Sequence, residues 1–331
     1  MTRRVRRLTA LLLAGTLAAS LTGCVGGAAA GSDETISPEN ESVYPEVETY
    51  PDIRVTEDVT YGIADGVPLT LDVCTPAPQD DPQLEQAERP AIVSIHGGSW
   101  RGGDKASVTW RSICQWFADA GYVTVSVNYR LAPEHTFPAQ LEDVQAVVEW
   151  LRAPARVQRY GIDTTRIGAF GGSAGGNLAA LLGTTGSGPW DSGARVAAVA
   201  DLSGPADLRS PIVTLDSATR DFPQAQREFL GCDSLAQCPE ARLASPTALV
   251  DETDPPHLVA HSTRDFIPIR QAADFVDELR AHDVDTTYIT VEGSQHSAAM
   301  LDDELRARLL DFFGRTLAAP AAPLPTATPA P

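Results

Sequence analysis

The chain has 331 residues, of which 43% are hydrophobic, and a formal net charge of −19 at pH 7. This length and apolar content supply a buried interior of the size found in large α/β enzymes. The surplus of Asp and Glu argues against a nucleic-acid-binding protein, because polyanions are bound by clustered Lys and Arg. The charge identifies no substrate, since acidic surfaces mainly keep proteins soluble.

The first 23 residues predict export. Four arginines in the first seven residues precede an apolar run from Leu8 to Leu21, an order typical of a secretory signal peptide. The ending Leu21-Thr-Gly-Cys24 resembles a bacterial lipobox, which would make Cys24 the lipid-carrying (palmitate) first residue of the mature protein. The protein would then be anchored to the cell membrane, facing outside the cytoplasm. An ordinary signal peptide remains an alternative, whereas a transmembrane anchor is disfavoured because about 20 apolar residues are needed to span a bilayer.

The remaining sequence predicts one domain between two low-complexity segments. Residues 24–50 are rich in Gly, Ala, Ser, Glu and Pro, which is typical of a flexible tether. Residues 318–331 are an Ala-Pro-Thr sequence typical of a disordered tail. Between them, residues 51–317 form one pattern without a second linker or an internal repeat.

Short apolar runs alternate with amphipathic segments along this domain. Strands are expected at residues 55–61, 67–73, 91–95, 123–128, 166–170, 196–202, 257–261 and 286–291. Helices are expected at residues 107–120, 138–151, 173–183, 269–282 and 298–317. This alternation predicts an α/β fold, with an eight-stranded, mostly parallel sheet covered by helices on both faces.

Two departures from strict alternation have structural consequences. No helix separates the first two strands, so they are expected to pair antiparallel at one edge of the sheet. Residues 203–256 are irregular and are expected to form a small cap over the carboxyl edge of the sheet, where open α/β sheets bind ligands.

The stretch Gly171-Gly-Ser-Ala-Gly-Gly176 lies between a predicted strand and a predicted helix. The pattern Gly-x-Ser-x-Gly in that context is typical of a nucleophile elbow, in which a serine stands on a turn so sharp that its neighbours must be small. By itself the pattern is equally compatible with a glycine-rich turn. If Ser173 is the nucleophile, the amide of Ala174 at the helix start would face the developing oxyanion.

A second glycine-containing loop, His96-Gly-Gly-Ser-Trp100, follows the strand predicted at residues 91–95. Glycines allow backbone amides to approach a substrate closely, so Gly98 and Ser99 are the candidate oxyanion donors, with Gly97 as a further possibility. The alternative is a strand-ending turn with a structural histidine. His96 is expected to hydrogen-bond within this loop and not to act as the base.

Among six histidines, His296 is the candidate base, because it follows the last predicted strand and precedes the final helix. The orienting acid should lie between serine and histidine in chain order, and Asp265 does so just after the strand at residues 257–261. An N-terminal helix cap is the alternative role for Asp265. The other histidines are expected to be structural (His257, His261 and His282) or to belong to an irregular loop (His135), and the rival acids are Asp251, Asp254 and Asp274.

Taken together, these segments resemble the α/β-hydrolase superfamily, in its hormone-sensitive-lipase-like and bacterial carboxylesterase branches. The resemblance covers about residues 55–316 and includes the two loops above, Asn128-Tyr-Arg-Leu-Ala-Pro-Glu134 and the segments around Asp265 and His296. It implies a Ser173–His296–Asp265 triad, an α/β-hydrolase fold and no metal or organic cofactor. It also implies structural roles for Tyr129, Arg130 and Asp143 beneath the active site.

Two positions depart from the lipase-like branch. Ser99 stands where a third glycine is usual, and Gly172 stands where an aspartate usually precedes the nucleophile. Both favour smaller esterases with a His-Gly-Gly-x-Trp loop, a branch that includes acetyl-esterase-like, feruloyl-esterase-like and arylformamidase-like members.

Four cysteines follow Cys24, an even number that suits an oxidising compartment. Cys232 and Cys238, six residues apart, are expected to form a local disulfide. Cys74 and Cys114 would be the second pair, with buried free thiols as the alternative. Their spacing fits no zinc pattern.

The sequence thus predicts a serine esterase that acts on short-chain or small aromatic acyl esters outside the cytoplasm. Trp100, Trp190 and Phe222 are candidates for the wall of its pocket. Expected partners are a small-molecule ester and, through the lipid, the membrane, with no nucleic acid. Two alternatives remain: an amidase or peptidase with the same triad, and an inactive lipid-anchored binding protein of the same fold.

Overall fold

The computed structural model describes residues 32–37, 48–77, 88–212 and 221–318. The predicted signal peptide, Cys24 and nearly all of the predicted tail lie outside the described residues. Within the described part, no helix has the length and hydropathy needed to cross a bilayer.

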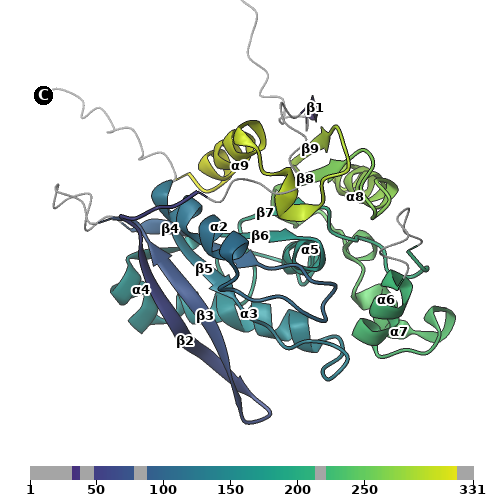
Figure 1. Cartoon of the computed structure of the whole chain (residues 1–331), viewed down its shortest axis with the longest axis horizontal. Coiled ribbons are helices and arrows are strands. Elements are labelled where there is room, and N and C mark those ends of the chain that lie inside the picture. Colours follow the sequence, from purple (N-terminus) through teal and green to yellow (C-terminus); the bar gives the residue numbers. More distant parts are fainter. Residues whose placement is uncertain (1–31, 38–47, 78–87, 213–220, 319–331) are drawn as a thin grey trace, which may run out of the picture. The chain divides into compact units, whose positions relative to one another are not determined.

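A nine-stranded sheet organises the described chain, in the order β1-β9-β8-β7-β6-β4-β5-β3-β2 (Figure 1). The predicted antiparallel edge is confirmed: β2 pairs antiparallel with β3, and β3 with β5, whereas every other pair is parallel. The strands are β1 Asp33–Ile36, β2 Arg54–Ala64, β3 Val67–Thr75, β4 Arg89–Ile95, β5 Val123–Val127, β6 Ile162–Gly172, β7 Ala198–Leu202, β8 His257–Ser262 and β9 Thr286–Val291.

Helices cover both faces of this sheet, as predicted. They are α2 Val108–Asp119, α3 Ala139–Arg152, α4 Pro154–Tyr160, α5 Ala174–Thr184, α6 Phe222–Leu230, α7 Pro239–Leu243, α8 Arg270–Ala281 and α9 Asp303–Thr316. The described residues also form three short 3-10 helices: η2 Leu235–Gln237, η3 Pro246–Ala248 and η4 Ser297–Met300.

The central strands are apolar on both sides because each side packs against helices. Ile92 of β4 lies in a buried cluster with side chains of α2 and α9, whereas the next residue, Val93, lies in the cluster that α3 and α5 complete. Successive side chains of a strand point to opposite faces, so a sheet covered on both faces requires uninterrupted apolar runs. Those uninterrupted runs are what made the parallel sheet predictable.

The sheet has one strand more than the eight predicted. Residues 33–36, assigned to the flexible tether from their composition, form β1 and pair in parallel with β9, from Asp33 opposite Tyr288 to Ile36 opposite Val291. Ile36 is buried against the same cluster as α9. A four-residue strand with one buried side chain carries too little pattern to be recognised, and an open edge strand supplies the pairing that forms it.

Candidate active site

Ser173 stands on a sharp turn between β6 and α5. Its φ of 57° and ψ of −124° lie in a region that residues other than glycine rarely occupy. The flanking glycines permit the turn through close approach: a Cβ on Gly171 would lie 2.1 Å from the carbonyl oxygen of Gly175, and one on Gly175 would lie 2.1 Å from that of Ile95. The elbow motif therefore has a steric reason at each of these positions.

The loop after β4 packs directly against this turn. A Cβ on Gly97 would lie 2.8 Å from the carbonyl oxygen of Gly172 and 3.1 Å from Cβ of Ser173. Among the described residues, the amides of Gly98 and Ser99 donate no hydrogen bond to the protein. Ala174 is the first residue of α5, where the helix supplies its amide with no acceptor. The three predicted oxyanion donors thus belong to two segments in contact with each other.

His96 fastens the start of this loop. Its Nδ1–H donates to the carbonyl oxygen of Gly97 at 2.8 Å, and its ring stacks on Tyr129 with the centroids 4.5 Å apart. The Tyr129 hydroxyl donates to the carbonyl oxygen of His96 at 2.9 Å. Burial lowers the pKa of His96 below its ordinary value, so the ring is neutral at pH 7. Next to Tyr129, the backbone amide and the guanidinium of Arg130 donate hydrogen bonds of 2.8–3.0 Å to the carboxylate of Asp143. These contacts agree with the structural roles that the resemblance implied.

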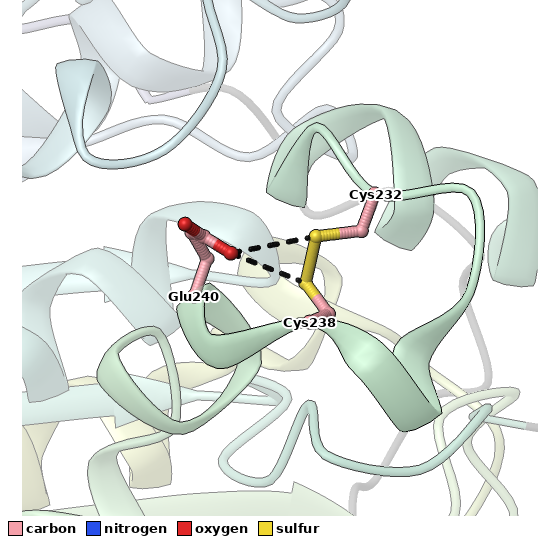
Figure 2. Close-up of side chains that lie close together, drawn as sticks. All are labelled: Cys232, Cys238 and Glu240. Atoms are coloured by element: carbon pink, nitrogen blue, oxygen red, sulfur yellow. Dashed lines mark hydrogen bonds between the residues drawn. A yellow bond between two sulfur atoms is a disulfide. The ribbon is translucent and has the colours of Figure 1, made fainter.

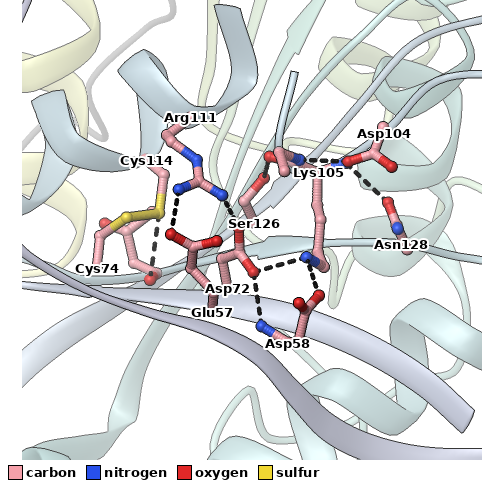
Figure 3. Close-up of polar contacts among 12 residues, drawn as sticks. Glu57, Asp58, Asp72, Cys74, Asp104, Lys105, Arg111, Cys114, Ser126 and Asn128 are labelled. Atoms are coloured by element: carbon pink, nitrogen blue, oxygen red, sulfur yellow. Dashed lines mark hydrogen bonds and ion pairs between the residues drawn. A yellow bond between two sulfur atoms is a disulfide. The ribbon is translucent and has the colours of Figure 1, made fainter. Parts of the chain in front are cut away.

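A polar network fastens the far end of the loop (Figure 3). The Lys105 amide donates to Oδ1 of Asn128 at 2.7 Å, and its Nζ donates to Asp72 at 2.6 Å and to Asp58 at 2.8 Å. Burial disfavours the charged amine, but the hydrogen bonds to Asp58 and Asp72 outweigh it and raise the pKa of Lys105. Arg111 of α2 reaches the other oxygen of Asp72 at 2.9 Å, so the buried carboxylate is paired on both sides.

Asp265 and His296 form a hydrogen-bonded pair at the carboxyl edge of the sheet. Nδ1 of His296 lies 2.9 Å from both carboxylate oxygens of Asp265. A carboxylate only accepts, so Nδ1 carries the proton and Nε2 is left with a free lone pair. Asp265 is 1% exposed and also accepts the amide of Ile267 at 3.0 Å. These contacts orient the imidazole.

Ser173 belongs to the same edge but makes no hydrogen bond to His296 in the described structure. Gly172 and Ser297, which adjoin Ser173 and His296 in the chain, are nevertheless in contact, because a Cβ on Gly172 would lie 2.0 Å from Oγ of Ser297. Hydrogen bonds between base and nucleophile are often long before substrate binds. Ser173 and the Asp265–His296 pair therefore lie close to each other, with β7 between the strands that precede Ser173 and Asp265.

The rival residues have other partners. Asp254 lies beside Arg195, and Asp274 pairs with Arg270 on α8. His257 is fully buried, and its Nδ1–H donates to the carbonyl oxygen of Pro255 at 2.7 Å. His261 has a role that its position in the sequence did not reveal: it is buried, with Nε2 3.9 Å from Asp265 and 2.9 Å from the carbonyl oxygen of Ile267. It thereby supports the loop that carries the acid.

The three residues proposed to line the pocket do not lie together. Trp100 is fully buried and stacks on Phe229 of α6 at 4.2 Å, and Phe222 lies beside it. Both side chains link α6, in the region predicted as a cap, to the loop after β4 that carries Gly98 and Ser99, called the oxyanion loop below. Trp190 cannot line the site, because it lies in a hollow of about 550 Å³ with Thr165 and Arg166, near the start of β6, whereas Ser173 follows the end of that strand.

Phe266 is the aromatic residue that sequence reasoning missed. It directly follows the acid, is half-buried, and its ring centroid lies 4.2 Å from that of His296. The ring of Phe266 also packs edge-on against that of Phe222, with the centroids 6.1 Å apart. An aromatic side chain next to a proposed acid could have been considered from the sequence, but only the folded loop brings it against the base.

Two disulfides join the cysteines in the predicted pairs. Cys74 of β3 is bonded to Cys114 of α2, and Cys232 is bonded to Cys238 in the cap. Glu240 lies beside the second bridge, with Oε2 3.5 Å and 3.7 Å from the two sulfurs (Figure 2). This grouping has the spacing of a metal site, but sulfurs bonded to each other are not thiolate ligands.

Known proteins share this arrangement of elements. The sequence model of the BD-FAE family matches residues 80–279, which is more than half of the chain. Esterase LipC of Mycobacterium tuberculosis is 33% identical over 226 residues, which cover 64% of this chain and 54% of LipC. Arylacetamide deacetylase of Bos taurus is 41% identical over 101 residues, or 30% of this chain and 25% of that protein. The matched part of the chain thus spans about half of LipC and a quarter of the deacetylase.

Solved structures extend the likeness over most of the chain. A truncated form of a carbohydrate esterase from gut microbiota superposes with a TM-score of 0.67 at 25% identity, covering 85% of this chain and 99% of that one. The butyrate-bound form of esterase 2 from Thermogutta terrifontis superposes with a TM-score of 0.62 at 26% identity, covering 83% and 96% of the two chains.

Proposed function

Because the chain belongs to the BD-FAE family of α/β-hydrolase carboxylesterases, we propose that it hydrolyses carboxylic esters through an acyl-enzyme formed on Ser173. The observation that carries this proposal is the Asp265–His296 pair, at 2.9 Å, at the same sheet edge as a serine on a strained, glycine-flanked turn. Strained backbone conformations of this kind cluster at functional sites.

In the proposed reaction, Nε2 of His296 takes the proton of Ser173 as Oγ attacks the ester carbonyl. Asp265 holds the imidazole in the required tautomer and stabilises its charged form. The amides of Gly98, Ser99 and Ala174 would bind the oxyanion, a contribution of about 3 kcal/mol for each well-placed donor. His296 then protonates the leaving alcohol, and water releases the acid by the reverse sequence.

The proposed substrates are short-chain or small aromatic acyl esters. Phe266, which lies against His296 and packs on Phe222, would offer an apolar surface to such an acyl group. The butyrate-bound relative supports a short acyl chain, and the match to an arylacetamide deacetylase makes aryl amides the second class to test. As a further part of the proposal, the lipobox at Cys24 would place the reaction outside the cytoplasm, at the membrane surface.

The test uses the full chain purified in detergent, with p-nitrophenyl acetate, butyrate and octanoate, a naphthyl ester and an acetanilide. Ser173→Ala should lower kcat/KM for the preferred ester by roughly 10⁴-fold or more and abolish labelling by a fluorophosphonate probe. Ser262→Ala, which changes an equally buried serine at the end of β8, is the matched control and should keep both. Turnover that survives Ser173→Ala would refute the proposal, and faster anilide than ester cleavage would favour the amidase alternative.

A further inference from the structure

The end of β7 contacts the segments that carry all three proposed triad residues. The amide of Ser173 donates to the carbonyl oxygen of Leu202 at 2.8 Å. The next residue, Ser203, donates its own amide to the carbonyl oxygen of Ala260 in β8, the strand that leads to Asp265, at 2.9 Å. Its hydroxyl oxygen accepts the amide of Ser297, next to His296, at 3.1 Å.

The side chain of Ser203 is committed to the base segment. It is 0% exposed, so water does not compete for the hydroxyl. Its oxygen accepts from Ser297 at the first residue of η4, and its hydrogen points to Sδ of Met300, the last residue of η4, at 3.8 Å. Both contacts of one hydroxyl therefore hold the short helix that follows His296.

The backbone of Ser203 is in a conformation that glycine adopts more easily, with a φ of 57°. Gly204 follows directly in the chain. A second glycine, at position 203, would therefore suit this turn. A serine in the left-handed region is strained unless its surroundings compensate for it. The bond to the Ser297 amide is the compensation that the structure offers.

Gly172 contacts the same residue, Ser297, through the space that its missing side chain leaves. Its missing side chain leaves the space in which Ser297 sits, because a Cβ there would lie 2.0 Å from Oγ and 3.2 Å from Cβ of Ser297. Ser297 itself has a φ of 58°. The residue after the base is thus held from one side by Ser203 and fitted from the other against the residue before the nucleophile.

We propose that Ser203 is a positioning residue that holds His296 in reach of Ser173, and that Gly172 is small because Ser297 occupies the space of its side chain. This inference rests on the proposed function. It also accounts for the departure from the lipase-like pattern, in which an aspartate precedes the nucleophile: in this chain the same space is filled from the histidine segment.

The first experiment compares Ser203→Ala and Ser203→Gly with the control Ser262→Ala, whose hydroxyl is buried at the end of the neighbouring strand without a partner in the described structure. Both Ser203 variants should lower kcat by between about 10- and 100-fold, because a misplacement of about 1 Å costs that much. KM should change by less than about twofold, since binding groups are retained. Ser203→Gly relieves the backbone strain, so it should unfold at a higher urea concentration than Ser203→Ala and yet be equally slow.

The second experiment separates positioning from stability. Gly172→Ala should displace Ser297 and lower kcat, whereas Gly172→Ala combined with Ser297→Ala removes the clashing oxygen and should recover most of the kcat that Gly172→Ala loses. Full activity of Ser203→Gly, or no recovery in the double variant, would overturn the inference. These results are interpreted only if Ser173→Ala is inactive; activity in Ser173→Ala would instead overturn the proposed function itself.

Discussion

Left-handed backbone conformations concentrate around the proposed nucleophile and base. Of the eight non-glycine residues with positive φ in the described chain, five lie there, namely Ser99, Trp100, Ser173, Ser203 and Ser297, and the other three are Asp58, Asp65 and Asp283. Each costs of the order of 1–3 kcal/mol in isolation and persists only where burial and hydrogen bonds leave no alternative. Here each strained residue brings an amide or a side chain to one side of the sheet edge.

At the same scale, the acid can be distinguished from its rivals by substitution. Asp265→Asn should lower kcat by roughly 10³- to 10⁴-fold, because the amide NH2 can donate to Nδ1 and so favour the tautomer that carries its proton on Nε2, and because a neutral amide does not stabilise the imidazolium. The measurement is steady-state hydrolysis of p-nitrophenyl acetate. Asp274→Asn, on the exposed side of α8 where it pairs with Arg270, is the control and should retain its rate. Equal losses in the two variants would argue against Asp265 as the orienting acid.

Among the elements, α6 and the oxyanion loop pack against each other through ion pairs and a ring stack. Arg101 of the loop reaches Asp221 at 2.7 Å and Glu228 at 3.2 Å, and the neighbouring Trp100 stacks on Phe229 of α6. These two ion pairs are partly exposed, so the stack between the buried rings contributes the larger share. The proposed acyl-binding site would therefore depend on the position of α6.

The two disulfides should differ in their effect on stability. Loop-closure entropy predicts about 4 kcal/mol for the 40-residue separation of Cys74 and Cys114, and about 2 kcal/mol for the six-residue separation of Cys232 and Cys238. Urea unfolding of the double alanine variants Cys74→Ala/Cys114→Ala and Cys232→Ala/Cys238→Ala measures both. The first pair should lower the free energy of unfolding more, and the reverse order would contradict this prediction.

The parallel sheet assembles the site at the scale of the whole molecule. Ser173, Asp265 and His296 follow the carboxyl ends of β6, β8 and β9, and parallel strands end at a common edge. Ser173 is thereby brought to the same sheet edge as Asp265 and His296, which follow it by more than ninety positions in the chain.

A buried carboxylate next to this edge should make global stability depend on pH. Burial raises the pKa of Asp201, at the end of β7, from 3.8 to about 7, although its carboxylate accepts a hydrogen bond from the amide of Gly204 at 2.8 Å. The folded state therefore holds a proton between pH 4 and pH 7 that the unfolded chain has lost. This contribution favours folding at low pH and is lost as pH rises through that window, by at most about 1.4 kcal/mol per pH unit.

Asp201→Asn removes this titration and keeps an oxygen acceptor for Gly204. The free energy of unfolding of the variant, relative to the native chain, should rise from pH 5 to pH 7 and then level off, as measured by urea denaturation at each pH. The exposed Asp274→Asn serves as the control and should follow the native chain throughout. Parallel curves for Asp201→Asn and the native chain would contradict the prediction.

The sequence alone predicted the α/β class, the antiparallel edge and the sharp turn at Ser173, all of which the structure shows, and it supplied the proposed chain order of nucleophile, acid and base. Each of these is written in local signals: uninterrupted apolar runs, small residues around a serine, and polar residues just after strands. Local signals could not identify β1, because a four-residue strand forms only when an edge partner is present. They also could not identify Ser203, Phe266 or the reason for Gly172. Those roles arise from contacts between segments far apart in the chain, so only the tertiary structure could decide them.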